Sequence, residues 1–176
     1  QISNAMCHEV FGCDSKVYPP MSDELRKSGI NFFQGYEEKN IVDADTYVIG
    51  NAISKENNLL REILKLEKKV ISGPEWLYEN ILSNKKVIAV SGTHGKTTVT
   101  SMIAHALVNN NFDPNFLIAG IPKKLKKSWN ISNDEVFVIE ADEYDTCYFD
   151  KRPKFFHYKP NILLINNIEF DHADIY

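Results

Sequence analysis

The sequence predicts an α/β protein with parallel sheets, and three observations support this fold class. Short apolar runs alternate with helical patterns along the chain, which is the order of a parallel sheet covered by helices. One of these runs, residues 87–90, leads through a glycine loop into a helix that begins near Lys96. Three apolar runs of the second half end in polar clusters, as strands do where the carboxyl ends of a parallel sheet form a ligand site.

The first half of the chain, residues 1–84, is predicted to be one domain in which strands alternate with helices. The expected order is the end of a helix at 1–8, a strand at 9–14, a helix at 21–28, strands at 30–33 and 45–50, a helix at 55–68, a strand at 69–71 and a helix from Gly73. Ser22 is expected to cap the helix at 21–28. Since a dinucleotide-type fold starts one strand earlier, with a glycine-rich turn, we expect a Rossmann-like domain that lacks its first strand.

Two of the predicted helices carry an apolar stripe at helical spacing. In the helix at 55–68 the stripe comprises Leu59, Leu60, Ile63, Leu64 and Leu66. In the helix after the glycine loop it comprises Val99, Met102, Ile103, Ala106 and Leu107. Both stripes are expected to pack on a sheet.

The polar segment at 83–86 is expected to join the first domain to a second one, residues 85–176. The predicted strands of this second domain lie at 87–90, 116–118, 136–139 and 161–165. The run at 136–139 is continuously apolar, which predicts a central strand that is buried on both faces, and the strand at 161–165 is expected to be buried as well. The sequence ends after the polar cluster of the last strand, so we expect only part of this second domain.

The loop after residues 87–90 has the residue order of a phosphate cradle. In G-T-H-G-K-T-T, residues 92–98, the glycines let backbone N–H groups turn toward an anion, and the helix start adds partial positive charge. Lys96 is placed to reach the terminal phosphates, and the Thr97 hydroxyl to hold Mg²⁺. The general pattern G-x-x-x-x-G-K-[ST] has a glycine where this chain has Val90. The predicted nucleotide-binding residues are Gly92, Thr93, His94, Gly95, Lys96 and Thr97.

Polar side chains that follow the other strands of the second half are expected to meet this loop. Glu140 directly follows the strand at 136–139, so its carboxylate is the first candidate to bind Mg²⁺, which prefers oxygen ligands. Asp142 and Glu143 fit either the site or a surface turn. The strand at 161–165 leads into Asn167 and His172, and a lone histidine here suits a hydrogen-bonding or general-base role.

Composition argues against several other classes of function. The 176 residues carry a net charge of −4 with scattered basic residues, so no nucleic-acid partner is expected. No apolar run approaches the roughly 20 residues that cross a bilayer, so no membrane insertion is expected. Cys7, Cys13 and Cys147 are odd in number and lack C-x-x-C spacing, which favours reduced thiols in a cytoplasmic protein and argues against zinc. The sequence does not indicate an oligomeric state.

Three motifs together resemble those of the Mur ligase family of bacterial cell-wall synthesis. They are G-T-H-G-K-T-T at 92–98, E-A-D-E at 140–143 and N-I-E-F-D-H at 167–172. The family uses the shortened glycine loop, which accounts for Val90. Within the family the likeness is sharpest to the members that attach a recovered murein tripeptide, because of Tyr144, F-D-K-R-P-K-F at 149–155 and H-Y at 157–158. The first half of the chain carries further motifs that resemble those of the same family members, namely G-x-D at 12–14, G-N-A at 50–52 and S-G-P-x-W-L at 72–77.

This resemblance implies a reaction and its cofactors. The reaction is an ATP-dependent ligation of UDP-N-acetylmuramate to the tripeptide L-alanyl-γ-D-glutamyl-meso-diaminopimelate through an acyl phosphate, in peptidoglycan recycling. The implied cofactors are ATP and Mg²⁺. The resemblance assigns catalytic roles to Lys96, Glu140, His172 and Asn167. It assigns metal sites to Thr97, Glu140 and His172, and substrate contacts in the first domain to Asp14, Asn51 and Ala52.

Two other interpretations stay open. A ligase that adds L-alanine to the same nucleotide sugar shares the glycine loop and the acidic cluster, but it typically has Ser where this chain has Tyr144 and lacks the stretch at 149–152. A non-catalytic nucleotide-binding module, or an inactive remnant, is the other interpretation. Because the family's first strand, the rest of its central domain and its carboxyl-terminal domain are missing from this sequence, we expect the chain alone to be an inactive fragment.

Overall fold

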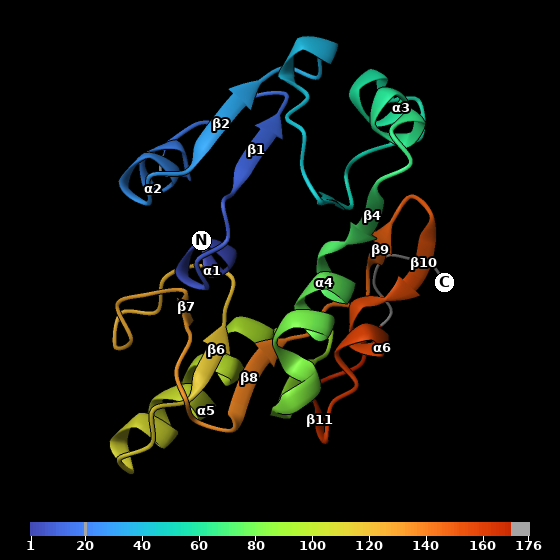
Figure 1. Ribbon diagram of the computed structural model, residues 1–176. Helices are drawn as coiled ribbons and strands as arrows, with labels where there is room; N and C mark the ends of the chain where they lie inside the picture. Colours follow the sequence, from blue (N-terminus) through green and yellow to red (C-terminus); the bar gives the residue numbers. More distant parts are fainter. Residues whose placement is uncertain (20, 170–176) are drawn as a thin grey trace. The chain divides into compact units, whose positions relative to one another are not determined.

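The chain forms two compact α/β units, Gln1–Ile71 and Ser72–Tyr176 (Figure 1). A computed structural model describes residues 1–19 and 21–169. Strands pair in parallel in both units, so the predicted fold class is confirmed. Within the described residues, none of the helices has the length and apolar character needed to span a membrane. Cys7, Cys13 and Cys147 are free thiols.

The first unit contains two separate pairs of strands. β1 (Phe11–Asp14) runs parallel to β2 (Asn31–Gln34), and β3 (Thr46–Ile49) pairs with β4 (Lys69–Ser72). The helices of this unit are short. They are α1 (Ile2–Ala5), α2 (Met21–Lys27), the 3₁₀ helix η1 (Glu38–Asn40) and α3 (Asn58–Lys65).

Three expectations for the helices of this first unit are wrong. Ser22 does not cap α2, because the helix begins at Met21 and Ser22 is a buried residue of its first turn. The stripe of α3 is narrower than expected, because Leu64 and Leu66 are 47% and 42% exposed. The helix is also shorter than expected, since Asn57 caps it by accepting a hydrogen bond from the Leu60 amide at 3.1 Å. The buried residues of α3 are Leu59, Leu60 and Ile63.

The second unit is built on a five-stranded sheet with the strand order β11-β5-β8-β6-β7. All neighbours in this sheet are parallel except β6 and β7. The strands are β5 (Lys86–Ser91), β6 (Asn115–Leu117), β7 (Trp129–Asn130), β8 (Val136–Glu140) and β11 (Ile162–Ile165). A separate antiparallel hairpin joins β9 (Asp145–Cys147) to β10 (Asp150–Pro153). The helices are α4 (Gly73–Asn80), η2 (Leu82–Asn84), α5 (Lys96–Asn109) and α6 (Lys154–Tyr158).

Helix α5 packs on β5 and β8, but not with the whole stripe that the sequence suggested. Its buried residues are Thr100 and Ala104, whereas Met102 is 65% exposed and Ala106 is also exposed. Thr100 is accommodated inside because its hydroxyl donates a hydrogen bond to the Lys96 carbonyl at 2.8 Å. The apolar core beneath the helix comprises Ala104, Phe116, Ile118 and Val138.

The two continuously apolar strands differ in their burial. β8 is central, and its residues Phe137, Val138 and Ile139 are at most 1% exposed, as expected for a strand buried on both faces. β11 was expected to be buried as well, and this expectation is wrong for the described residues. β11 lies at the edge of the sheet with β5 as its neighbour, and Ile162 and Ile165 are 58% and 54% exposed.

Asn115 at the start of β6 provides a test of what stabilises the second unit. Its side chain is fully buried and pairs with three backbone groups: Nδ2 donates to the carbonyls of Asp134 at 2.7 Å and Val136 at 3.1 Å, and Oδ1 accepts from the Ser132 amide at 2.7 Å. Asn115→Ala leaves these groups unpaired in the interior. We expect the free energy of unfolding to fall by about 3 kcal/mol.

Urea denaturation followed by tryptophan fluorescence measures this change, because Trp76 and Trp129, the two tryptophans of the chain, both lie in the second unit. Asn109→Ala is the matched control. Asn109 is exposed and hydrogen-bonds only with His105 on its own helix among the contacts of the described residues, so an effect within about 0.5 kcal/mol is expected. Equal effects of the two substitutions would contradict the assignment.

Candidate active site

The loop between β5 and α5 has a conformation that requires glycine at two positions. Gly92 and Gly95 have φ angles of +131° and +77°, which L side chains rarely adopt. A Cβ atom on Gly92 would lie 2.9 Å from the backbone nitrogen and oxygen of Asn167. A Cβ atom on Gly95 would lie 2.9 Å from Asn166 Nδ2. Two residues after β11 therefore occupy the space that side chains would need in this loop.

Hydrogen bonds connect the same residues to the loop. The Asn166 amide donates to the Ser91 carbonyl at 2.9 Å, which continues the pairing of β11 with β5. The His94 amide donates to Asn167 Oδ1 at 2.8 Å, and the Thr93 amide donates to the Asn167 carbonyl at 3.1 Å. These two loop amides are therefore engaged by Asn167 instead of being open to an anion.

The first turn of α5 offers N–H groups to an anion in place of the two loop amides that Asn167 engages. The amides of Lys96, Thr97 and Thr98 have no acceptor within the helix, because a helix leaves its first donors unpaired. Among the described residues no side chain caps this end, and the first turn contains no acidic residue. A phosphate placed here would accept these N–H groups and gain from the helix dipole.

Lys96 is directed back over the loop and is paired with a carboxylate. Its side chain is 16% exposed, and its Nζ donates to the Gly92 carbonyl at 2.7 Å. Glu143, itself 17% exposed, places Oε2 at 3.1 Å from the same nitrogen. The choice between a surface turn and the site is thereby decided for Glu143, which lies in the site.

Thr97 and Glu140 form the second polar contact of the site. The Thr97 hydroxyl donates to Glu140 Oε2 at 2.9 Å, and Glu140 Oε1 accepts from the Ala119 amide at 2.6 Å. Glu140 reaches this position because it pairs with Val90 in the register of β5 and β8. A hydroxyl and a carboxylate are hard oxygen ligands, so the pair fits Mg²⁺. The described residues contain no group of three or more His, Cys, Asp or Glu side chains that would hold a metal.

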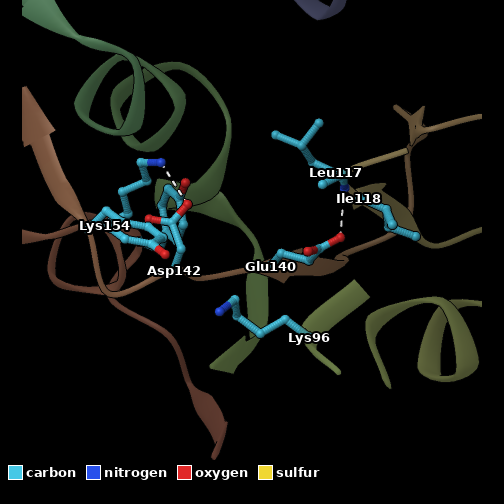
Figure 2. Close-up of a pocket in the computed structure, with 9 residues that line it drawn as sticks. Lys96, Leu117, Ile118, Glu140, Asp142 and Lys154 are labelled. Atoms are coloured by element: carbon cyan, nitrogen blue, oxygen red, sulfur yellow. Dashed lines mark hydrogen bonds and ion pairs between the residues drawn. The ribbon is translucent and has the colours of Figure 1, made fainter. Parts of the chain in front are cut away.

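A cavity of about 420 Å³ lies beside these groups and is lined by residues of the second unit only. Figure 2 shows Lys154 and Asp142 on one side of it and Glu140 with Leu117 and Ile118 on the other. Lys96 also lines the cavity. Its volume is within the range of small-molecule sites. Lys96, the lysine that the sequence predicts to reach the phosphates, and a cavity of this size are therefore adjacent.

The far side of the cavity is built by Asp142 and Tyr144, which precede β9, and by Lys154 and Tyr158 of α6. Lys154 Nζ donates to Asp142 Oδ2 at 2.7 Å, so Asp142 also lies in the site and not in a free surface turn. Tyr158 is 6% exposed, and burial, with a smaller contribution from the Asp142 charge, raises the pKa of its hydroxyl. The hydroxyl is therefore neutral at physiological pH.

An ion-pair network fixes the hairpin against α6. The Arg152 guanidinium donates to both carboxylate oxygens of Asp150, at 3.0 and 2.6 Å, and this contact lowers the pKa of Asp150 to about 2. His157 Nε2 lies 3.0 Å from Asp150 Oδ2, and His157 is buried. These contacts hold the segment that carries Lys154.

The structure brings together most of the residues that the sequence singled out in the second unit. Lys96, Thr97, Glu140 and Asn167 surround the loop, while the side chain of His94 is exposed. His172 lies outside the described residues. The residues that sequence reasoning missed are Glu143 as the partner of Lys96, Asn166 as a loop contact and Lys154 as a cavity residue.

The predicted substrate residues of the first unit follow two different strand pairs. Asp14 ends β1, and its Oδ1 accepts from the Ser15 amide at 2.6 Å and from the Tyr36 hydroxyl at 3.1 Å. Asn51 and Ala52 form an exposed turn after β3. Each therefore lies at the carboxyl end of a strand, and their role in binding a nucleotide sugar stays a prediction.

Comparisons with known proteins agree with this geometry. The family description "Mur ligase family, catalytic domain" matches residues 2–85, and "Mur ligase middle domain" matches residues 90–176. A UDP-N-acetylmuramate–L-alanyl-γ-D-glutamyl-meso-2,6-diaminoheptandioate ligase of Escherichia coli is 44% identical over 99% of this chain, which spans 38% of that protein. A UDP-N-acetylmuramate–L-alanine ligase of Chlorobium chlorochromatii is 38% identical over 89% of this chain and 32% of its own length.

A solved structure extends the comparison to three dimensions. The crystal structure of a UDP-N-acetylmuramate:L-alanyl-γ-D-glutamyl-meso-diaminopimelate ligase from Neisseria meningitidis superposes with a TM-score of 0.95 at 45% identity. The match covers 99% of this chain and 57% of that one. With family matches in both halves and this agreement in fold, the chain belongs to the Mur ligase family.

Proposed function

We propose that the protein to which this chain belongs is an ATP-dependent ligase that joins UDP-N-acetylmuramate to L-alanyl-γ-D-glutamyl-meso-diaminopimelate in peptidoglycan recycling. The observation that carries the proposal is that Lys96 and Glu140 line one cavity near the carboxyl ends of β5 and β8, where the Thr97 hydroxyl donates to Glu140. We assign residues 85–176 to the ATP-binding domain and residues 1–84 to the domain that binds the UDP group through Asp14, Asn51 and Ala52. A cytoplasmic location is part of the same proposal.

The reaction requires activation of a carboxylate, which is a poor electrophile until one of its oxygens is phosphorylated. Lys96 would bind the β- and γ-phosphates and neutralise charge as the phosphoryl group is transferred. Thr97 and Glu140 would hold Mg²⁺, which supplies further positive charge at the phosphates, and His172 is proposed as an additional ligand. Asn167 would act by holding the loop, since its backbone and side chain both accept loop amides.

An assay of ADP release tests the proposed reaction. The whole native protein, given ATP, UDP-N-acetylmuramate and the tripeptide, is expected to release ADP and form the amide product. The 176-residue chain alone spans less than two fifths of the curated ligase it resembles, and we expect no turnover from it. Turnover of the isolated chain near that of the whole protein would contradict this expectation.

The ligase that adds L-alanine is the second candidate, and the 38% identity to such an enzyme is the observation in its favour. The two candidates differ in the amine that attacks the acyl phosphate. Product formation by the whole protein with L-alanine, and none with the tripeptide, would support the second candidate. Failure of the chain to bind ATP at all would support an inactive remnant.

Replacement of Lys96 tests the phosphate site in this chain directly. Lys96→Met removes the ammonium that would contact the phosphates, and we expect ATP affinity to fall at least about tenfold, because a charged hydrogen bond is lost. Titration calorimetry with Mg²⁺ and ATP measures the change. Lys86→Met is the matched control, since Lys86 lies in β5 but is 66% exposed and pairs with Glu135. An unchanged affinity in Lys96→Met would contradict the phosphate role.

Replacement of Glu140 tests the metal site. In Glu140→Gln the charged metal ligand is lost while the side-chain shape is kept. We expect ATP to bind the wild-type chain several-fold more tightly with Mg²⁺ than with EDTA, and this difference to shrink in the variant. Glu135→Gln is the control, since Glu135 is exposed and lies just before the same strand. A full magnesium effect in Glu140→Gln would argue that Glu140 does not bind the metal.

A further inference from the structure

The cavity beside the phosphate loop contains a second lysine that the phosphates do not require. Lys154 and Lys96 line the same cavity but come from different helices, α6 and α5. Lys154 is 20% exposed, which is low for a lysine, and its ammonium lies 2.7 Å from Asp142 Oδ2. A lysine is normally solvated, so a largely buried one has been placed by the fold.

The segment that carries Lys154 is rigidly held. Pro153 directly precedes it, and the Thr146 hydroxyl donates to the Arg152 carbonyl at 2.7 Å. The Asp150 network with Arg152 and His157 then joins the hairpin to α6. Because Lys154 and Tyr158 are four residues apart in α6, both side chains project toward the same cavity. Lys154 thus has a fixed place at the cavity wall.

The ion pair between Asp142 and Lys154 leaves hydrogen-bonding groups unused on both side chains. Asp142 Oδ1 is buried and has no hydrogen-bond partner among the described residues, so Lys154 is bound through one carboxylate oxygen. An ammonium group has three N–H donors, and Asp142 uses one of them. A further anion can therefore bind Lys154 without breaking the pair with Asp142, which would act as the group that orients the lysine.

We propose that Lys154 binds the substrate carboxylate that receives the phosphoryl group. This inference rests on the proposed function, which requires a carboxylate to approach a triphosphate closely. Two anions at that distance repel each other, so each requires its own cation. Lys96 serves the phosphates, and Lys154 is the other lysine that lines the cavity. The ligand class is a sugar acid whose carboxylate meets Lys154 and whose apolar faces meet Leu117, Ile118 and Tyr158.

The experiment compares two ligands that differ only in the carboxylate-bearing group. UDP-N-acetylmuramate carries a lactyl carboxylate, and UDP-N-acetylglucosamine is the same nucleotide sugar without the lactyl ether. Both are titrated by calorimetry against the whole native protein and its Lys154→Met variant. We expect Lys154→Met to weaken UDP-N-acetylmuramate by about 10- to 100-fold, the effect of one charged hydrogen bond, and to leave UDP-N-acetylglucosamine unchanged. Unchanged binding of the second ligand also shows that the variant is folded.

Lys151→Met is the matched control. Lys151 lies in the same hairpin and pairs with Asp145, but it is 69% exposed, so both affinities should stay within about twofold of wild type. The inference is overturned if Lys154→Met weakens both ligands equally or weakens neither. If the whole wild-type protein binds both ligands with the same affinity, the carboxylate site fails while nucleotide-sugar binding stands. If it binds neither ligand, the proposed substrate fails as well.

Discussion

The parallel register of β5 with its two neighbours is the constraint on which the site depends. Val90 lies opposite Glu140 of β8, and Ser91 lies opposite Ile165 of β11. Because parallel strands end at the same edge of a sheet, the residues that follow each strand must meet there. A shift of one residue in the pairing of β5 with β8 would turn Glu140 to the other face of the sheet. A shift of one residue in the pairing of β5 with β11 would move Asn166 away from the loop.

The conformation of the glycine loop between β5 and α5 therefore depends on a segment that is more than 70 residues away in the sequence. Asn166 and Asn167 fill the space beside Gly92 and Gly95, and they accept or donate hydrogen bonds along the loop. The glycines are required by this close approach as much as by their positive φ angles. The loop is one side of a packed contact with the end of β11, and that contact holds the loop in its conformation.

Much of this architecture could be predicted, because it depends on local patterns. Apolar runs identified β5 and β8, and the spacing from Gly92 to Thr97 identified the loop and the start of α5. Burial was predicted less well, because it depends on neighbours. β11 has the composition of a central strand but lies at an edge of the sheet. In α5 the apolar periodicity favoured Met102, whereas the fold buries Thr100, whose hydroxyl bonds within the helix.

The acidic cluster after β8 shows why the site could be predicted only in part. Glu140, Asp142 and Glu143 are three nearby carboxylates, and only Glu140 could be placed in the site from its position directly after a predicted strand. In the structure each has a different partner: Glu140 the Thr97 hydroxyl, Asp142 the Lys154 ammonium and Glu143 the Lys96 ammonium. Such long-range pairs have no signature in spacing. The missed residues are thus those whose role depends on a partner from another element.

These pairings have a consequence for how the site accepts its ligands. Both lysines of the cavity already contact a carboxylate of the chain, so an incoming anion meets neutralised pairs and not free cations. Burial makes unpaired charges costly, and the pairs keep the lysines in place without a ligand. A triphosphate offers Lys96 more negative charge than Glu143 does, and a metal ion held at Thr97 and Glu140 would add to its attraction. We therefore expect anion affinity at this site to be a difference between two electrostatic interactions that depends on Glu143 and Asp142 as well as on the lysines.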